Sequence, residues 1–330
     1  MNTFRAFRIH QIDSKIVSRI DTISLDDLTP GEVVVKVAYS DINFKDALAA
    51  TGTGKILRKY PLVGGIDLAG EVVSSTDAQF KPGQAVLVTG GLLSEIYDGG
   101  YAEYARVKSE LVIPMPAGLD PRSAMIIGTA GFTAALAIHR MEQNGLAPSQ
   151  GEVLVNGATG GVGSMAIDML SGRGYDVVAL TGKKESESYL QGLGAKRILL
   201  RSELQMGTKP MEAQLWAGAV DNLGGDHLSW LIRTTKDWGT VAAVGMAQSG
   251  ELKGTVFPFI LRGVNLVGAN SVTIPRAPRL AVWQRIATDL KPRHLDAIGV
   301  RTVTLDELPN AFDAHIKSAV TGRTLVKIGK

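Results

Sequence analysis

The feature that most constrains the fold is a glycine run directly after a short apolar segment. The apolar residues Val153-Leu154-Val155 precede the run Gly157-Ala158-Thr159-Gly160-Gly161-Val162-Gly163, and residues 164–170 are typical of a helix. A strand, a tight glycine turn and a helix start in this order let the backbone approach a pyrophosphate closely, with N–H groups directed at the anion. The spacing is G-x-x-G-x-x-G, which differs from the usual dinucleotide pattern, so a glycine turn without a ligand stays open from the motif alone.

Length and composition indicate a globular protein with room for two domains. The chain has 330 residues, of which 45% are hydrophobic and 20% charged, and its net charge is +3. Basic and acidic residues are interleaved, which argues against a nucleic-acid partner. No uninterrupted apolar run reaches the roughly 18 residues of a membrane span, and the N-terminus lacks a secretion-signal pattern. We therefore expect a cytoplasmic protein that does not bind membranes.

Secondary-structure signals divide the chain into three stretches. Short β-branched runs separated by Pro-Gly turns fill the first 120 residues and indicate a compact β-rich domain. Over 152–268 strands alternate with helices, which favours right-handed βαβ units in a parallel sheet, with strands expected at 153–156, 176–180, 197–200, 218–222, 240–244 and 265–268. The remaining tail, with a helix over 279–290 and strands over 300–305 and 324–328, is too short for a domain. We expect it to complete the first one.

The residues that follow the second strand of the parallel sheet bear on the choice of cofactor. In NAD-binding units an acidic residue near this point hydrogen-bonds the ribose hydroxyls. Here the strand is followed by Thr181-Gly182-Lys183-Lys184, without a carboxylate. A hydroxyl, a backbone turn and ammonium groups suit a 2′-phosphate, so the sequence predicts NADPH rather than NADH. Both lysines can also be read as solvated loop residues, and the missing acid is the stronger half of the argument.

Three more strand ends are expected beside the cofactor, because ligands bind at the carboxyl edge of a doubly wound sheet. They are Asp221-Asn222, Gly245-Met246-Ala247 and Asn270-Ser271. Each combines small or polar residues with the end of a predicted strand. Together they predict a channel for the nicotinamide and its ribose.

Five further segments make the chain similar to the medium-chain dehydrogenase/reductase superfamily. They are NFKDAL at 43–48, GIDLAG at 65–70, MIIGTAGFTA at 125–134, FPFILR at 257–262 and GRTLVK at 322–327. With the glycine run they resemble the zinc-free, quinone-oxidoreductase-like branch, and within it the bacterial acrylyl-CoA reductases. The resemblance extends over nearly the whole chain.

The resemblance implies an α/β architecture in which a Rossmann domain with a doubly wound parallel sheet is inserted into a GroES-like, β-rich catalytic domain. We expect the catalytic domain at 1–122 and 272–330 and the NADPH-binding domain at 123–271. A homodimer formed by edge pairing of two nucleotide-domain sheets is also implied, with 264–267 apolar enough to be that edge. The cofactor-binding residues predicted from the strand ends and the resemblance are Phe44, Thr133, Thr159, Gly160, Gly161, Val162, Thr181, Gly182, Lys183, Asn222, Gly245, Met246, Asn270, Ser271 and Arg323.

A metal is not expected. The zinc alcohol dehydrogenases of this superfamily have Gly-His-Glu where this chain reads Gly65-Ile66-Asp67, and they use cysteine ligands, of which this chain has none. No pair of the five histidines has metal-ligand spacing. Without a Lewis acid, an alkene already activated by a thioester is an easier acceptor than a ketone.

The resemblance implies that NADPH delivers hydride to the β-carbon of an unsaturated acyl-CoA, so that charge builds on the thioester oxygen. Asn43 is the side-chain candidate to hydrogen-bond this enolate, with backbone N–H groups equally possible. We predict that Asn43 or Asp46 holds the water that supplies the proton, because Phe44 stands where the family commonly has a tyrosine. Asp46 and Asp67 have an alternative role as braces of a loop.

Two basic features are further candidates for contacts with phosphates. Arg323 is predicted to hold a phosphate of NADPH or coenzyme A, with a surface role as the alternative. The loop that contains Lys55, Arg58 and Lys59 is a candidate for coenzyme A phosphates, although such a run is usually solvated.

Three functions stay open from the sequence. The first is NADPH-dependent reduction of acryloyl-CoA to propanoyl-CoA, a small-molecule acyl-CoA substrate. The second is reduction of quinones or general enones. The third is an NADPH-binding sensor or structural protein with little catalysis, against which the intact Asn43 loop argues.

Overall fold

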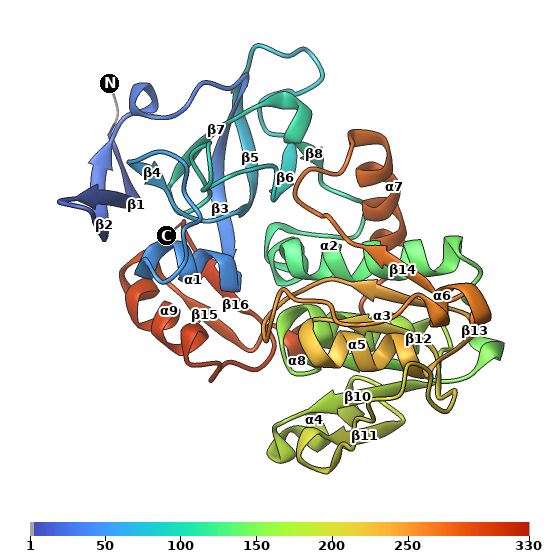
Figure 1. Ribbon diagram of the computed structural model, residues 1–330. Helices are drawn as coiled ribbons and strands as arrows, with labels where there is room; N and C mark the ends of the chain where they lie inside the picture. Colours follow the sequence, from blue (N-terminus) through green and yellow to red (C-terminus); the bar gives the residue numbers. More distant parts are fainter. Residues whose placement is uncertain (1–2, 330) are drawn as a thin grey trace. The chain divides into compact units, whose positions relative to one another are not determined.

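The computed structural model describes residues 3–329, and these divide into two compact units (Figure 1). Within the described residues, the first comprises 3–129, Val272–Trp283 and 295–329, and the second comprises Ala130–Ser271 and Gln284–His294. Compared with the expected limits, the first unit also takes 123–129 and the second also takes 284–294. The second difference has a clear cause, because the Arg285 guanidinium lies 2.7 Å from a carboxylate oxygen of Glu142, within the second unit.

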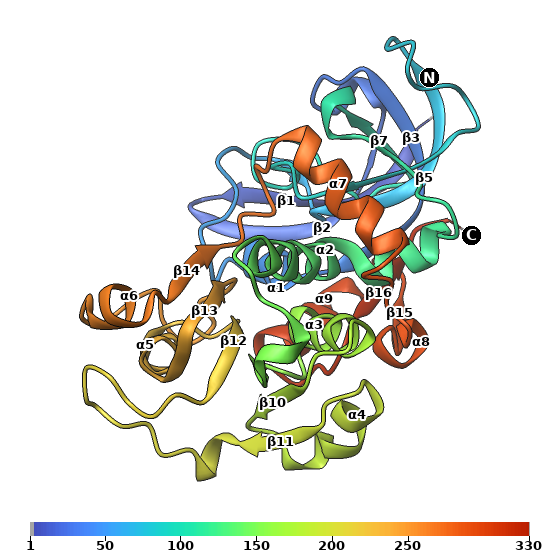
Figure 2. The ribbon, with the colours of Figure 1, turned by 90° about the vertical axis from the view of Figure 1, so that its right-hand side faces the viewer.

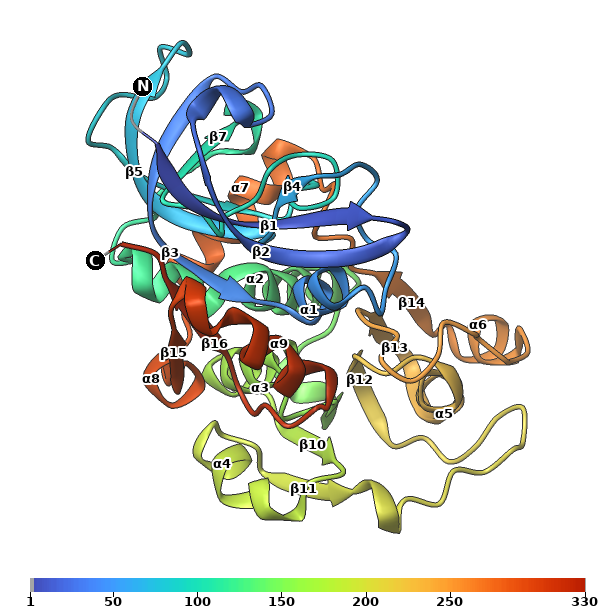
Figure 3. The same ribbon diagram turned by 90° about the vertical axis from the view of Figure 1, so that its left-hand side faces the viewer.

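The first unit is built on two β-sheets. The smaller has the strand order β2-β1-β4 and is antiparallel, and its long β1–β2 hairpin is visible in Figure 3. The larger has seven strands in the order β15-β16-β3-β5-β6-β8, with β7 pairing to β3. The strands are β1 (Phe4–Ile12), β2 (Lys15–Ile23), β3 (Val33–Ile42), β4 (Leu62–Val63), β5 (Asp67–Ser75), β6 (Ala85–Thr89), β7 (Tyr104–Val107), β8 (Ile113–Pro114), β15 (Arg301–Val303) and β16 (Thr324–Lys327).

The returning tail completes the first unit, as the sequence predicts. Strand β16 pairs antiparallel with β3, with Thr324 opposite Ile42. The helices of this unit are α1 (Phe44–Thr51), α8 (Leu295–Ile298) and α9 (Leu308–Ile316), and α9 packs on α1. Residues from the first 130 positions and from the last 30 therefore share one core.

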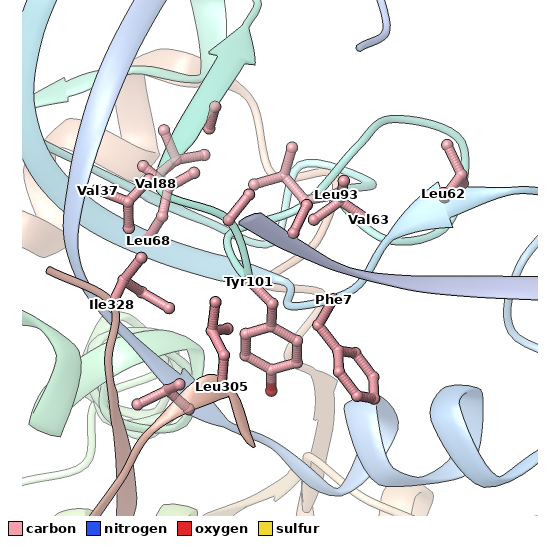
Figure 4. Close-up of a cluster of buried hydrophobic side chains, with 14 of the residues drawn as sticks. Phe7, Val37, Leu62, Val63, Leu68, Val88, Leu93, Tyr101, Leu305 and Ile328 are labelled. Carbon is pink, nitrogen blue, oxygen red and sulfur yellow. The ribbon is translucent and has the colours of Figure 1, made fainter. Parts of the chain in front are cut away.

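That core is an apolar cluster enclosed by the two sheets and the tail (Figure 4). The Phe7 and Tyr101 rings meet edge to face with centroids 6.3 Å apart, and both are buried together with Leu68 and Leu305. The Tyr101 hydroxyl donates to the carbonyl of Asp41 at 2.9 Å. This bond connects the core to the end of β3, where the polar residues described below begin.

The second unit contains a six-stranded, fully parallel sheet in the order β11-β10-β9-β12-β13-β14, parts of which are labelled in Figure 2. The order reverses between β9 and β12, and this is the switch point at which doubly wound sheets bind ligands. Helix α3 packs on β9 and β10, and α5 packs on β12 and β13. The strands are β9 (Val153–Asn156), β10 (Val177–Thr181), β11 (Arg197–Leu200), β12 (Trp216–Asp221), β13 (Thr235–Ala243) and β14 (Asn265–Gly268).

The expected strands of this sheet are all present, and the expected α/β fold class is confirmed. The largest difference is at β13, which begins at Thr235 rather than at 240. Its first residues, Thr235 to Trp238, are polar or have positive φ (61° at Trp238), so they lack the pattern of a buried strand. The helices are α3 (Gly161–Gly172), α4 (Glu187–Gly192), α5 (Gly225–Thr234) and α6 (Phe257–Arg262).

Two helices contribute residues to both units. Helix α2 (Pro121–Gln143) is interrupted at Gly128, where φ is 50° and ψ is −159°, and α7 spans Arg276–Ala287. Among residues 3–329, α2 is the one helix long and apolar enough to cross a membrane, but 83% of its apolar window is buried within the fold. It therefore has the surroundings of a core helix. Six 3-10 turns complete the secondary structure, at Leu25–Asp27, Ser109–Leu111, Pro148–Gln150, Lys184–Ser186, Arg201–Glu203 and Leu305–Glu307.

Candidate active site

Four charged side chains are buried together in the first unit, where β3 ends and α1 begins. Asp41 and Asp67 are fully buried, Asp46 is 2% exposed and Arg323 is 3% exposed. Buried charges are costly unless they are paired and hydrogen-bonded, so the contacts of each define its role. The half-buried amide of Asn43 lies among them. We call these five residues the Asn43 cluster.

Arg323 reaches this cluster from the start of β16. Its Nη2 lies 2.9 Å from Asp41 Oδ1, and its Nη1 donates to the carbonyl of Ile42 at 3.2 Å and to Asn43 Oδ1 at 3.1 Å. Its Nε donates to the carbonyl of Ile126 at 3.2 Å. The guanidinium is thus surrounded by oxygens of its own unit. A phosphate would have to displace these buried bonds, and a contact between Arg323 and a phosphate stays a prediction.

Asn43 is the centre of the cluster. Its Nδ2 donates both hydrogens, to Asp41 Oδ1 at 2.8 Å and to Asp67 Oδ2 at 2.9 Å, while its Oδ1 accepts from Arg323. The two carboxylates and the guanidinium leave one sensible amide orientation, with nitrogen toward the acids. The side chain therefore has no hydrogen left for an enolate, which corrects its predicted role as a donor.

Asp46 braces the turn rather than facing a substrate. Its Oδ2 accepts the backbone N–H of Asn43 at 2.8 Å, which closes a capping box at the start of α1, and its Oδ1 accepts the N–H of Ile66 at 3.0 Å. Burial raises the pKa of Asp46 to about 7, against the lowering effect of these bonds. The prediction that Asp46 holds a catalytic water is not supported, and the alternative role as a brace agrees with the contacts.

Asp67 connects three segments. It accepts from the Gly90 N–H at 3.1 Å, from the Thr129 N–H at 2.7 Å and from the Thr129 hydroxyl at 2.5 Å, in addition to Asn43. Its bracing role is the one that the sequence favours.

Burial also raises the pKa of Asp41 well above its usual range. The nearby Arg323 lowers this pKa, and the charge of Asp67 raises it further. Three carboxyl groups and one guanidinium are thus buried together here.

The predicted phosphate site in the second unit has the expected strand, turn and helix. Gly157 has a φ of 57°, which suits glycine, and α3 begins at Gly161 with Gly160 at its N-cap position. A Cβ at Gly163 would lie 2.4 Å from the Gly157 carbonyl oxygen, so only glycine lets the helix pack this closely. No side chain caps this helix start. These residues fit a pyrophosphate.

The ends of β9 and β12 are connected by a polar network at the switch point. The Asn156 amide donates to Asp221 Oδ1 at 2.5 Å, and Asn222 donates through its backbone N–H to Asn156 Oδ1 at 2.6 Å. The Asn222 side chain donates to the Asn156 carbonyl at 2.8 Å, and its Cβ lies 3.0 Å from an ideal Cβ at Gly157. The structure thus places the predicted cofactor residue Asn222 directly beside the glycine turn.

The end of β10 contains a cation that sequence reasoning missed. Thr181 accepts the Lys183 N–H through its hydroxyl at 3.0 Å, which forms the tight turn. The guanidinium of Arg201 lies 3.0 to 3.4 Å from an ideal Cβ at Gly182 and is exposed. Arg201 is the first residue after β11, the neighbouring strand. Its position at the carboxyl end of a parallel strand is the signal that could have identified it.

The other predicted cofactor residues of the second unit also gather at the carboxyl edge of this sheet. Thr133 donates to the Ser271 hydroxyl at 2.8 Å, and both side chains are buried. Gly245 and the 74%-exposed Met246 follow β13, and the exposed Asn270 follows β14. The residues that form the glycine turn and the first residues of α3 are Thr159, Gly160, Gly161 and Val162.

Phe44 belongs to the first unit, where it is 49% exposed at the start of α1. Whether these residues contact a cofactor stays a prediction.

Two family models match the chain. "Alcohol dehydrogenase GroES-like domain" matches residues 29–117, and "Zinc-binding dehydrogenase" matches residues 161–288. The zinc in the second description does not follow from these residues, because the chain has no cysteine and no group of three metal-ligating side chains was found over 3–329.

Similar proteins cover the whole chain. YhfP of Bacillus subtilis, whose name places it among quinone oxidoreductases, is 47% identical over 98% of this chain and 99% of that protein. The acrylyl-CoA reductase AcuI of Ruegeria pomeroyi is 46% identical over 95% of both. The crystal structure of yhdH from Salmonella enterica in complex with NADP has a TM-score of 0.95 at 45% identity, covering 98% of this chain and 100% of that one. That of Bacillus subtilis yhfP with NAD bound has a TM-score of 0.96 at 47% identity, covering 99% and 100%.

The chain belongs to the medium-chain dehydrogenase/reductase superfamily, in its quinone-oxidoreductase-like branch. It is an oxidoreductase of this class, with a GroES-like unit and a parallel Rossmann sheet. The solved relatives contain NADP or NAD, which agrees with the predicted nicotinamide cofactor.

Proposed function

We propose that this protein reduces the activated C=C bond of acryloyl-CoA to propanoyl-CoA with NADPH. The observation that carries the proposal is the 46% identity to an acrylyl-CoA reductase over 95% of both chains. A relative of equal similarity has a quinone oxidoreductase name, so the substrate needs support from the residues themselves.

The preference for NADPH rests on the end of β10. The three residues after this strand include no carboxylate, the Arg201 guanidinium lies beside Gly182, and Thr181 and Lys183 flank Gly182 in the turn. An acidic residue there would repel a 2′-phosphate, whereas a guanidinium binds one through paired N–H donors. The glycine turn and the start of α3 would hold the pyrophosphate. When bound, NADPH supplies the hydride for the β-carbon of the thioester.

The protein must then stabilise negative charge on the thioester oxygen. Since both amide hydrogens of Asn43 are used within its cluster, we assign this task to backbone N–H groups. The Asn43 cluster acts as a positioning device, because it fixes the turn from which the exposed Phe44 ring projects. Phe44 cannot donate a proton, so water is the proton source and the ring packs against the nicotinamide.

One assay separates this proposal from its alternatives. Purified protein is given NADPH with acryloyl-CoA, crotonyl-CoA or benzoquinone, and NADPH absorbance is followed. The proposal expects the highest kcat/KM with acryloyl-CoA. Higher kcat/KM with benzoquinone would favour a quinone or enone reductase, and cofactor binding without consumption would favour a sensor or structural protein.

The cofactor assignment has its own test. Arg201→Ala and Lys183→Ala should each raise the KM for NADPH about tenfold while leaving the KM for NADH unchanged, because only NADPH has the 2′-phosphate. Lys196→Ala is the matched control, since Lys196 precedes β11 at the opposite edge of the sheet and pairs with Asp176. Equal losses for both cofactors would contradict the assignment.

We also propose a cytoplasmic homodimer. Strand β14 lies at one end of the six-strand order, and the adjacent α6 exposes Ile260 by 70% and Leu261 by 63%. An edge strand beside exposed apolar side chains is a ready surface for pairing with a second copy.

A further inference from the structure

A large basic hollow in the first unit has no role in the function described so far. It lies between the turn of the β1–β2 hairpin, the first turn of α1 and the loop 55–60, and its volume is about 1060 Å³. That volume is at the upper end of the range for small-molecule sites. Ser14, Lys45 and Tyr60 mark its three sides. We call it the basic hollow.

The charges around the basic hollow are strongly unbalanced. Four cations line it, and Glu95 is its one carboxylate, which leaves three positive charges in excess. Glu95 Oε1 lies 2.7 Å from Lys45 Nζ, and its Oε2 lies 3.8 Å from Arg58 Nη2. Within residues 3–329 no ion pair involves Lys55 or Lys59, and both are exposed. This local excess of positive charge attracts anions.

The loop that presents these cations is fixed in place. Leu57 is 3% exposed and anchors the loop in the core, between the exposed Lys55 and Arg58. The backbone N–H of Arg58 donates to the Glu95 carbonyl at 2.8 Å, and that of Ile56 donates to Gly54 at 3.0 Å. A buried anchor and backbone bonds reduce the ordering cost of binding, which distinguishes this loop from a solvated run of lysines.

The basic hollow is continuous with the turn of the Asn43 cluster. Lys45, which lines it, follows the exposed Phe44 in the first turn of α1, and Gly52 and Gly54 line it beyond the other end of that helix. The loop reaches this first turn, because Lys45 and Arg58 contact the two oxygens of the same Glu95 carboxylate. A ligand with its anionic end among the loop cations can therefore direct its other end toward Phe44.

We propose that the basic hollow binds the 3′-phosphorylated adenosine diphosphate end of a coenzyme A thioester, an inference that rests on the proposed function. Coenzyme A has a compact anionic end that carries a pyrophosphate and a 3′-phosphate, and a long pantetheine arm that ends in the thioester. The cations suit the phosphates, and the arm can extend from them toward the first turn of α1. A free quinone or small enone lacks the anionic end and gains nothing from this hollow.

The experiment compares acryloyl-CoA with acryloyl-pantetheine, which has the same reacting group without the phosphates. NADPH oxidation is measured at saturating NADPH for the wild type, for the double variant Arg58→Ala/Lys59→Ala, and for the control Lys81→Ala/Lys291→Ala. The control removes the same charge from exposed positions outside the hollow. Circular dichroism and the KM for NADPH verify folding and the cofactor site in each variant.

We expect the double variant to raise the KM for acryloyl-CoA about tenfold with kcat unchanged, which is the mark of lost ground-state binding. Its KM for acryloyl-pantetheine and the constants of the control should stay at the wild-type values. Raised salt should weaken acryloyl-CoA binding in the wild type more than in the double variant. Equal KM values for the two thioesters in the wild type, or equal losses in the double variant and the control, would overturn the inference. Absence of turnover with both thioesters would instead refute the proposed function.

Discussion

Gly128 offers the sharpest test of how the Asn43 cluster is held. Its φ of 50° and ψ of −159° interrupt α2, and this region of backbone space is nearly restricted to glycine. A Cβ at this position would lie 2.0 Å from Asp41 Oδ2 and 2.7 Å from Arg323 Nη2. Ordinary contacts between heavy atoms are about 3.5 Å, so an added methyl group must displace the ion pair between them.

Two costs add up for Gly128→Ala. The backbone conformation costs about 1–3 kcal/mol for an L-residue. Separating a buried ion pair so that one partner loses its countercharge costs about 3–5 kcal/mol. We therefore expect Gly128→Ala to lower the free energy of unfolding by about 4 kcal/mol or more.

Gly118→Ala is the matched control. Gly118 lies in the same unit with a φ of 81°, and nothing lies within 4 Å of its ideal Cβ, so this variant measures left-handed strain alone. We expect it to lose about 1–2 kcal/mol. Guanidinium unfolding curves of both variants give the difference, and amide exchange of the β3–β16 pairing locates it. The reasoning is refuted if Gly128→Ala loses no more stability than Gly118→Ala.

Three further outcomes follow from the structure. Burial raises the pKa of Asp46 from 3.8 to about 7, so the folded state keeps a proton that the unfolded state releases between these pH values. The free energy of unfolding should therefore fall as pH rises from 4 to 7, by about 4 kcal/mol at most. Asp46→Asn should flatten this slope in unfolding curves measured across that pH range. Elemental analysis should find substoichiometric zinc in the purified protein, and a chelator should leave activity unchanged; one tightly bound zinc per chain would contradict the expectation. Ile260→Asp/Leu261→Asp should convert a dimer to a monomer in light scattering, whereas Val300→Asp, at the 65%-exposed Val300 of the other unit, should leave the dimer intact.

Local pattern was sufficient to predict most of the architecture. The turn after β9 and the six parallel strands have short-range signatures, since apolar runs and glycines determine them within a few residues. The return of the tail to the first unit followed from its length, because so few residues cannot bury a core of their own. Pairing of β16 with β3 confirms that argument.

The roles of individual polar residues were less predictable, because they depend on partners far apart in sequence. Asn43 and Arg323 are 280 positions apart, and each was predicted to face a ligand. In the structure Arg323 donates to Asn43 and pairs with Asp41. The Asn43 amide in turn donates to Asp41 and Asp67. Sequence identifies a polar side chain but not the buried groups that use up its hydrogen bonds. Arg201 was missed although it directly follows the predicted strand 197–200, whose carboxyl end lies beside that of β10.

The large distance in sequence between Asp41 and Arg323 has a consequence for biosynthesis. Domains fold largely in order as the chain is made, and the second unit is complete once residue 294 has been added. The carboxyl groups of Asp41 and Asp67 are synthesised much earlier, and Arg323 is added only after the second unit is complete. A chain truncated before β16 would therefore leave these acids uncompensated, and we expect it to be recognised by cellular quality control as an unfinished protein.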